Sequence, residues 1–437
     1  MIDAAAFAEL LGAHLPRQRW FAGRERVQVE VRLELLCEQP VRLVRALVGV
    51  AGQSGVYQVV AALRARDFHA PFLAARPQAV IGEVPAEAGG ILLAYDALVD
   101  PEAAIALLAR VAPQARVTQA RVIAGEQSNS SVVFDDRLIL KLFRHVSDGP
   151  NPDAEVVRGL QRVGFECVAR RVADWREADR DYAVVNEYLA GARDGFELAL
   201  ESVRMLHRRG SGSASPGHAF AREARALGDT TGRLHAKLAE AFGTFAGDPA
   251  ALTADMAAQL QRVNGVPKDR IAAAYGLVAA GTDVGPAIRV HGDYHLGQVM
   301  WRDPRWYVLD FEGEPARPLK ERRRASSPLK DVAGMLRSFD YAAAVALRER
   351  TGSADEASVA LADAWRDGAG QAFLEGYFAA PGVDAVLPAS PRARRTLLDA
   401  FLLDKAVYEV GYEQAHRPDW VEIPERAIER LLERHAD

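Results

Sequence analysis

The sequence predicts an α+β fold with two lobes, the first rich in β-strands and the second mainly helical. In the first part, apolar and polar residues alternate over several short runs, which is the pattern of half-buried strands. In the second part, apolar residues recur mostly at helical spacing. We therefore expect an N-terminal β-rich cap module at 1–90, a second strand-rich part at 91–190 and a mainly helical lobe at 191–437.

Each expected element follows from a local pattern. Strands are expected over 27–33, 41–50, 56–63, 117–123, 131–134, 138–143, 183–189, 287–290 and 306–309. The first residues, with Phe7 and Leu11 one turn apart, predict an amphipathic helix, and a short helix is expected at 103–111. Asn151, followed by acidic residues, predicts a helix start. The glycine- and serine-rich run 210–217 predicts a surface loop.

Composition and charge exclude several classes of protein. The formal net charge of -5 disfavours nucleic acid as a partner, because nucleic-acid binders usually carry a basic surface. No stretch is apolar for long enough to cross a bilayer, and the N-terminus lacks the basic start of a secretory signal. Cys37 and Cys167 lie far apart in no metal-binding spacing. We therefore expect a soluble, cytoplasmic protein with reduced thiols.

The segment 291–298 carries the strongest chemical signal. Asp293 precedes an amide, Gln298, and Asp310 follows at the end of the next strand. Transfer of a phosphoryl group from ATP needs an aspartate to orient and deprotonate the attacking hydroxyl, and oxygen ligands to hold magnesium. The order and spacing are those of the catalytic loop and metal-binding aspartate of kinases, with Gln298 in place of the usual asparagine. These residues predict Asp293 as the base.

Two other interpretations apply to this segment. In the first, His-Gly-Asp is an ordinary turn and Asp310 only caps the end of a strand. The segment 291–298 and Asp310 occur together at kinase spacing, with a predicted β-hairpin between them, and this combination favours the catalytic interpretation. His291 and His295, four residues apart, would suit zinc on a helix face. Gly292 and Gly297 instead favour a loop, and no third ligand is evident.

The part at 91–190 contains the residues expected to bind ATP. The run 125–131 lies between two strand-like runs, where its backbone N–H groups and hydroxyls can contact phosphate; the residues assigned are Gln127, Ser128, Asn129 and Ser130. Lys141 lies in an apolar strand and is expected to pair with Glu155, because an unpaired buried lysine is costly. A solvent-facing lysine on an edge strand is the alternative. Glu187 and Leu189 end an expected strand that is followed by a glycine, where a kinase hinge would offer backbone hydrogen bonds to adenine.

A family resemblance adds to these patterns. The segments 18–23, 126–134, 291–298, 310–319, 327–341 and 404–409 look like the actinobacterial maltokinases, and the resemblance spans almost the whole chain. It implies an aminoglycoside-phosphotransferase-like, bilobal protein-kinase-like fold with an N-terminal cap. It also implies ATP-dependent conversion of maltose to maltose 1-phosphate, which feeds α-glucan (glycogen) synthesis. Its motifs imply Asp293 as the base, Gln298 and Asp310 as Mg²⁺ ligands, and Glu312 as a further ligand.

The chain departs mildly from the maltokinase pattern. Ser130 stands where threonine is expected in the phosphate loop, and 24–26 replaces a glycine or lysine of the cap. Related actinobacterial enzymes phosphorylate glucosamine and carry a different sequence after the metal-binding aspartate; the run 312–315 favours maltose. Another sugar or an aminoglycoside as acceptor stays open. A non-catalytic binding protein would have no chemical reason to keep Lys141, Asp293, Gln298 and Asp310 together.

The segment 404–420 is rich in aromatic and polar side chains. Leu403, Val407 and Val410 form an apolar helical stripe, and Lys405, Tyr408 and Glu409 are expected mostly off it, along one face. Sugar sites combine aromatic faces with carboxylates and amides. We therefore assign Lys405, Tyr408 and Glu409, together with His295, to the sugar. A solvated helix face with ordinary charge pairs is the alternative.

Overall fold

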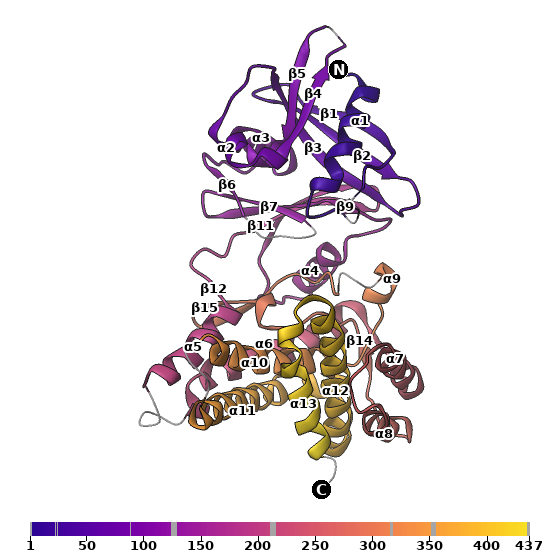
Figure 1. The fold of residues 1–437 in the computed structure, drawn as a ribbon, viewed down its shortest axis with the longest axis vertical. Helices are drawn as coiled ribbons and strands as arrows, with labels where there is room; N and C mark the ends of the chain where they lie inside the picture. The colour runs from indigo at the N-terminus through magenta and orange to yellow at the C-terminus, as the bar shows by residue number, and fades with distance from the viewer. Residues whose placement is uncertain are drawn as a thin grey trace. The chain divides into compact units, whose positions relative to one another are not determined.

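The chain forms two compact units. The computed structural model describes residues 2–21, 23, 25–87, 89–123, 129–209, 216–314, 318–350 and 355–434. Unit 1 comprises Met1–Glu155 and Ala169–Ala190, and unit 2 comprises Val156–Val168 and Gly191–Asp437. Unit 1 is built on antiparallel sheets, whereas helices dominate unit 2 (Figure 1). This confirms the expected α+β fold; the finer three-part division stays a prediction.

The first sheet of unit 1 has both faces buried. Its strand order is β1-β2-β3-β5-β4, with β9 paired to β3. Its strands are β1 (Val29–Cys37), β2 (Arg42–Val50), β3 (Val56–Ala65), β4 (Val80–Pro85), β5 (Ile91–Asp96) and β9 (His145–Val146). Along β3, Val60 and Ala62 join one apolar cluster while Val59 and Ala61 join another. Side chains alternate between the faces of a strand, so a near-continuous apolar run is needed here.

Helices cover the faces of this sheet. The helices whose residues lie wholly in unit 1 are α1 (Ala4–His14), α2 (Pro71–Ala75) and α3 (Pro101–Val111). Phe7 of α1 packs in one cluster and Leu107 of α3 in the other. Each of these two helices begins after an aspartate, Asp3 or Asp100, whose carboxylate accepts the first backbone N–H groups. Both predicted helices are confirmed.

The second sheet of unit 1 places Lys141 on a central strand. The order is β10-β11-β8-β7-β6. The strands are β6 (Ala120–Val122), β7 (Asn129–Phe134), β8 (Leu138–Phe143), β10 (Arg171–Glu177) and β11 (Arg180–Glu187). Lys141 lies opposite Ser131 of β7 and Val184 of β11. The alternative of an edge-strand lysine is therefore wrong.

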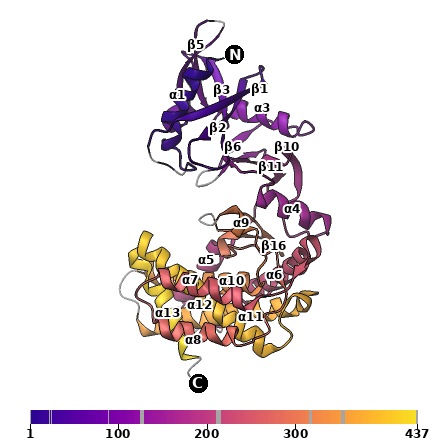
Figure 2. The same ribbon diagram turned by 90° about the vertical axis from the view of Figure 1, so that its right-hand side faces the viewer.

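Unit 2 is a helical assembly with short strands. Its helices are α5 (Gly195–Arg209), α6 (Ala221–Phe242), α7 (Pro249–Arg262), α8 (Lys268–Ala279), α9 (Leu319–Arg322), α10 (Leu329–Arg348), α11 (Glu356–Ala379), α12 (Pro391–His416) and α13 (Glu422–Glu433), and α4 (Pro152–Arg162) reaches it from unit 1. Its strands are β12 (Arg193–Asp194), β13 (Thr244–Phe245), β14 (Ala287–Ile288), β15 (Val299–Arg302) and β16 (Arg305–Val308). Helices α12 and α13 lie side by side in two views at right angles (Figures 1 and 2).

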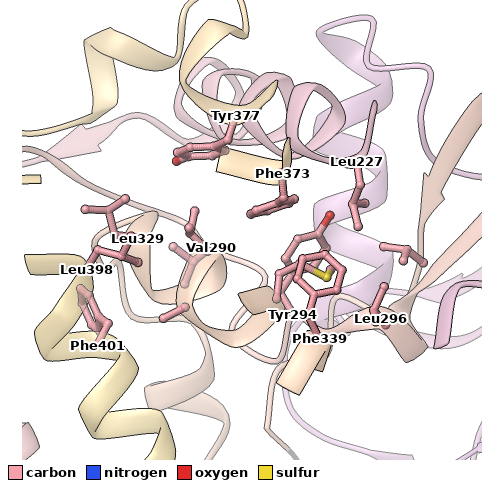
Figure 3. Close-up of a cluster of buried hydrophobic side chains, with 14 of the residues drawn as sticks. Leu227, Val290, Tyr294, Leu296, Leu329, Phe339, Phe373, Tyr377, Leu398 and Phe401 are labelled. Atoms are coloured by element: carbon pink, nitrogen blue, oxygen red, sulfur yellow. The ribbon is translucent and has the colours of Figure 1, made fainter. Parts of the chain in front are cut away.

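Aromatic and aliphatic side chains from α6, α10, α11 and α12 meet in one core (Figure 3). Phe339 of α10 lies edge-on to Phe373 of α11, with ring centroids 6.0 Å apart. Helices α6 and α11 approach very closely, because a Cβ on Gly228 would lie 2.0 Å from the carbonyl oxygen of Phe373. Only glycine fits this crossing.

Two strands expected from the sequence are shorter in the structure. The strand expected at 117–123 is confined to β6, and that at 287–290 to β14. The loop expected at 210–217 falls largely outside the described residues. The helix after Asn151 is confirmed, since the Asn151 side chain accepts the backbone N–H groups of Asp153 and Ala154 at 2.9 and 3.2 Å. No helix among the described residues is long and apolar enough to span a bilayer. Cys37 and Cys167 are free thiols, as expected.

His14 is a buried, uncharged group in the core of unit 1. Its side chain is fully buried. Burial lowers the pKa of His14 to about 4; nearby Asp96 and the backbone of Val80 oppose this change, and Arg17 and Arg144 reinforce it. The folded state therefore rejects a proton that the unfolded chain accepts near pH 6.5.

This pKa predicts a pH-dependent stability. Above about pH 6.5, His14 is neutral in both the folded and the unfolded state, so it does not make the stability depend on pH. As pH falls from about 6.5 toward about 4, only the unfolded chain binds the proton, and the free energy of unfolding decreases. The total effect is about 3 kcal/mol. We expect His14→Leu to flatten that part of the profile when urea midpoints are compared with wild type between pH 7 and pH 4. Parallel profiles for the two proteins would contradict the assignment.

Candidate active site

The segment 291–298 is a loop anchored in the core of unit 2 by buried side chains. The Tyr294 ring is buried directly after Asp293, and its hydroxyl lies 2.9 Å from the hydroxyl of Thr231. Val290 and Leu296 are buried in the same core (Figure 3). The loop continues through a short 3₁₀ turn into the hairpin of β15 and β16, as expected. Asp293 thus lies between apolar anchors while its own side chain is partly exposed.

A buried carboxylate, Asp331, holds the start of this loop. It accepts the backbone N–H groups of His291 at 2.7 Å and Gly292 at 2.9 Å, and it lies 3.3 Å from Nε2 of His235. Burial by itself raises the pKa of Asp331, but the hydrogen bond and charge of His235 bring it below its ordinary value. The carboxylate is therefore satisfied in its ionised form.

Two glycines allow this close arrangement. Gly292 has a φ of +86°, in the region that disfavours side chains. At Gly334 of α10, a Cβ would lie 2.5 Å from the carbonyl oxygen of Tyr294. Helix α10 can therefore bring Asp331 against the loop only because position 334 has no side chain.

Backbone contacts place Gln298 beside Leu309, which links the end of β16 to Asp310. The N–H of Leu309 donates to the carbonyl oxygen of Gln298 at 2.9 Å. Nε2 of His291 lies 2.8 Å from the carbonyl oxygen of Leu309, which joins the start of the loop to the same strand end. Asp310 itself adopts a φ of +59°, which turns the chain sharply before Glu312.

These residues fit a Mg²⁺ site made with a nucleotide. An amide oxygen and a carboxylate are the hard oxygen ligands that Mg²⁺ prefers, and it takes further ligands from phosphates and water. Among the described residues, no group of three or more His, Cys, Asp or Glu side chains is placed to hold a metal. Gln298, Asp310 and Glu312 have the oxygen ligands that Mg²⁺ takes together with phosphate and water; their role stays a prediction.

Helix α12 brings Lys405 to Asp293. The ammonium of Lys405 lies 3.9 Å from Oδ1 of Asp293 and 3.5 Å from Oε1 of Glu314. It also lies 4.7 Å from the centre of the Tyr408 ring. Burial by itself lowers the pKa of Lys405, but the charges of Glu314 and Asp293 raise it above its ordinary value. On the other side of Asp293, Nε2 of His295 lies 4.0 Å from Oδ2.

The placement of Glu409 differs from the expectation. It is buried, and its Oε2 accepts hydrogen bonds from Nε and Nη2 of Arg337 at 2.8 and 2.6 Å. The prediction that Glu409 lies off the apolar stripe is wrong, because α12 buries a wide face against α10 that also includes Ala406 and Glu413. Lys405 and Tyr408 remain partly exposed, whereas the Glu409 carboxylate is engaged by Arg337.

Lys141 of unit 1 contacts an acid at the start of α4. Its ammonium lies 3.5 Å from Oδ2 of Asp153. Asp153 was not among the residues expected from sequence, although it stands in the same first helical turn as Glu155. The contact supports the expectation that the buried lysine is paired with an acid of this helix; the pair with Glu155 stays a prediction.

The phosphate-loop candidates lie at a junction inside unit 1. Gln127 and Ser128 fall outside the described residues, whereas Asn129 and Ser130 begin β7. Nε of the buried Arg144 donates to the hydroxyl oxygen of Ser130 at 2.8 Å, and Nη2 donates to Asp96 at 2.5 Å. The same guanidinium lies 5.0 Å from the centre of the Trp20 ring. Residues of the first sheet thereby support the start of β7.

In the segment expected to act as the hinge, 187–189, two backbone N–H groups already donate hydrogen bonds within the protein. The N–H of Glu187 donates to the carbonyl oxygen of Arg170, and that of Tyr188 to Arg137, both at 2.8 Å. Any contact that the Glu187 residue makes to adenine must therefore use its carbonyl oxygen. A hydrogen bond from Leu189 to adenine stays a prediction.

Sequence reasoning did not identify Asp331 or Glu314 as parts of this site. A signal for Asp331 exists: it is the one acid in the first two turns of α10, next to the apolar residues Val332 and Ala333. Such an acid needs a buried partner. Glu314 carries no comparable signal, because its burial depends on Lys405, which lies far away in the sequence.

Comparisons with known proteins agree with this architecture. Residues 14–100 match the maltokinase N-terminal cap domain, and residues 119–395 match the phosphotransferase enzyme family. A glucosamine kinase of Streptacidiphilus jiangxiensis is 33% identical over 354 residues, covering 76% of this chain and 77% of the relative. A glucosamine kinase of Mycolicibacterium smegmatis is 30% identical over 333 residues, covering 72% and 79%.

A solved structure is also similar over almost the whole chain. It is a glucosamine kinase in complex with glucosamine, ADP and inorganic phosphate, with a TM-score of 0.70 and 27% identity. The match covers 97% of this chain and 99% of that chain. The chain therefore belongs to the phosphotransferase enzyme family, and it is an ATP-dependent phosphotransferase with a hydroxyl group as acceptor.

Proposed function

We propose that the acceptor is a sugar, that this sugar is maltose, and that the product is maltose 1-phosphate for α-glucan synthesis. The observation that carries the sugar site is the cluster in which Lys405 and Glu314 meet Asp293. Charged hydrogen-bonding groups beside the Tyr408 ring are the combination that sugar hydroxyls and ring faces bind. Maltose is supported by the match to the maltokinase cap domain and by the resemblance of 291–341 to maltokinases.

In this proposal Asp293 accepts the proton of the acceptor hydroxyl as that oxygen attacks the γ-phosphorus of ATP, and the bond between this phosphorus and the bridging oxygen breaks, so that ADP leaves. The Lys405 ammonium lies 3.9 Å from Oδ1 of Asp293. The Asp331 contacts hold the loop before substrate arrives, so little reorganisation is needed. Gln298 and Asp310, with Glu312 as a further ligand, would hold Mg²⁺, which neutralises phosphate charge when bound.

Glucosamine is the second candidate acceptor. The observation in its favour is that the curated relatives and the solved structure reported above are glucosamine kinases. The cluster around Asp293 holds two carboxylates, Asp293 and Glu314, and one ammonium, Lys405, so its charge is compatible with an amino sugar as well as with a neutral one. Both acceptors use the same base and the same metal ligands.

We expect an acceptor screen to single out maltose. ATP consumption is measured with maltose, glucosamine, glucose and an aminoglycoside, and the phosphorylated carbon is located by ³¹P–¹H NMR. The expected result is the highest kcat/KM for maltose and a phosphate on its anomeric oxygen. Preference for glucosamine, or phosphate on a 6-hydroxyl, would retain the sugar kinase and reject the maltokinase assignment.

Replacing the base should abolish turnover but not binding. We expect Asp293→Asn to lower kcat by about 10²–10⁴-fold, the usual contribution of a positioned base. Maltose affinity, measured by calorimetry, should stay within a few-fold of wild type. Asp269→Asn, an exposed aspartate in α8, is the control and should leave kcat unchanged. Wild-type turnover in Asp293→Asn would reject the mechanism.

Replacing a predicted Mg²⁺ ligand should also lower turnover. We expect Asp310→Asn to lower kcat by about 100-fold or more, because charge on the transferred phosphoryl group is no longer neutralised. Excess chelator should have the same effect on wild type, and added Mg²⁺ or Mn²⁺ should restore it. Asp303→Asn, an exposed change in the turn between β15 and β16, is the matched control. Full turnover of wild type in chelator would contradict the metal requirement.

A further inference from the structure

Unit 2 contains a cavity that the proposed reaction does not use. It lies among α10, α11, α12 and α13 and has a volume of about 650 Å³. These four helices are grouped together in both views of the fold (Figures 1 and 2). The volume is that of a site for a small organic molecule. Its described lining includes none of the residues assigned to ATP, metal or sugar.

One part of the cavity wall is apolar. Leu336 of α10, Leu374 and Phe378 of α11, and Leu431 of α13 contribute side chains to it. Gly370 of α11 lines the same space, and a Cβ added there would touch Leu336 at an ordinary 3.4 Å. An apolar body would replace water along this wall, which is favourable in proportion to the area covered.

The other part of the wall is formed around Asp340. Arg337, Arg366 and Arg430 converge on its carboxylate: Arg337 in direct contact, Arg430 at 2.7 Å and Arg366 at 3.5 Å. Arg337 also contacts Glu409. Asp340 and the three arginines line the cavity, whereas Glu409 is not part of its lining.

The lining of the cavity carries an excess of positive charge. Asp363 and Asp367 also pair with Arg366, but their side chains are 49% and 61% exposed, so water screens them. Asp340 and Arg366 are only 14% and 13% exposed. Counted over all its lining residues, the cavity has four arginines (Arg337, Arg366, Arg430 and Arg434) and three acids (Asp340, Asp367 and Glu375), which is one net positive charge. Burial lowers the pKa of Arg430; Arg366 and Arg337 lower it further, whereas Asp340 and Asp363 raise it.

We propose that this cavity binds a small amphipathic anion, with an apolar body against the leucines and a single negative charge at Arg366 and Arg430. A carboxylate or sulfonate would accept hydrogen bonds from the guanidinium of Arg430, which donates to Asp340 from one terminal nitrogen and has further donors. The anion would complete the charge balance of a wall that has one more cation than anion.

The test uses 8-anilinonaphthalene-1-sulfonate, an aromatic monoanion that fluoresces when bound, with the full-length protein. N-phenyl-1-naphthylamine serves as the uncharged analogue. We expect saturable binding of the sulfonate, weakened about 10-fold or more in Arg430→Gln, because a charged hydrogen bond is lost. The uncharged analogue should be affected much less. Arg426→Gln, an exposed arginine one turn earlier in α13, is the matched control.

A second variant tests the apolar part without removing a charge. Gly370→Leu places a side chain in the cavity and improves helix propensity, so the melting temperature should not fall. We expect it to weaken both probes by about 10-fold or more, whereas Gly276→Leu in α8, where a Cβ meets open space, should not. Absence of saturable sulfonate binding, or equal affinity in Gly370→Leu and wild type, would overturn the proposal.

Discussion

The candidate active site in unit 2 depends on the buried carboxylate of Asp331. An ionised carboxylate can be buried only when hydrogen bonds replace the water it has lost, and Asp331 obtains them from two backbone N–H groups of the loop and from His235. Those donors come from α6 and from the loop 291–298, while the acceptor belongs to α10. The requirement therefore fixes three segments at once and orients the chain immediately before Asp293.

The same constraint explains why small residues recur around the loop. A carboxylate in α10 reaches the loop only if the helix approaches it closely, and position 334 would clash with Tyr294 if it carried a Cβ. Once that approach is made, α12 packs on α10 through the buried pair of Arg337 and Glu409. This packing places Lys405, one turn before Glu409, against Asp293. Arg337 also lines the cavity, so one side chain serves both the helix contact and the cavity wall.

In unit 1 the buried Arg144 has a comparable role. Arg144 contacts Trp20 and Asp96 of the region that matches the maltokinase cap domain, and Ser130 at the start of β7. A planar guanidinium suits this position, because it donates in several directions and stacks on an aromatic ring at the same time. The cap residues therefore take part in ordering the strand that carries two of the expected phosphate ligands.

The sequence alone determined the α+β class, the order of most strands and helices, and the motif of Asp293, Gln298 and Asp310, because these follow from periodicity and spacing along the chain. The hairpin between Gln298 and Asp310 and the helix start at Asn151 are of this kind. Tertiary structure decided what depends on partners distant in sequence. Lys141 meets Asp153, Glu409 turns inward to Arg337, and Glu314 is buried beside Lys405. A polar side chain in a helix pattern looks the same whether it faces water or a buried partner, since only packing supplies the opposite charge that makes its burial favourable.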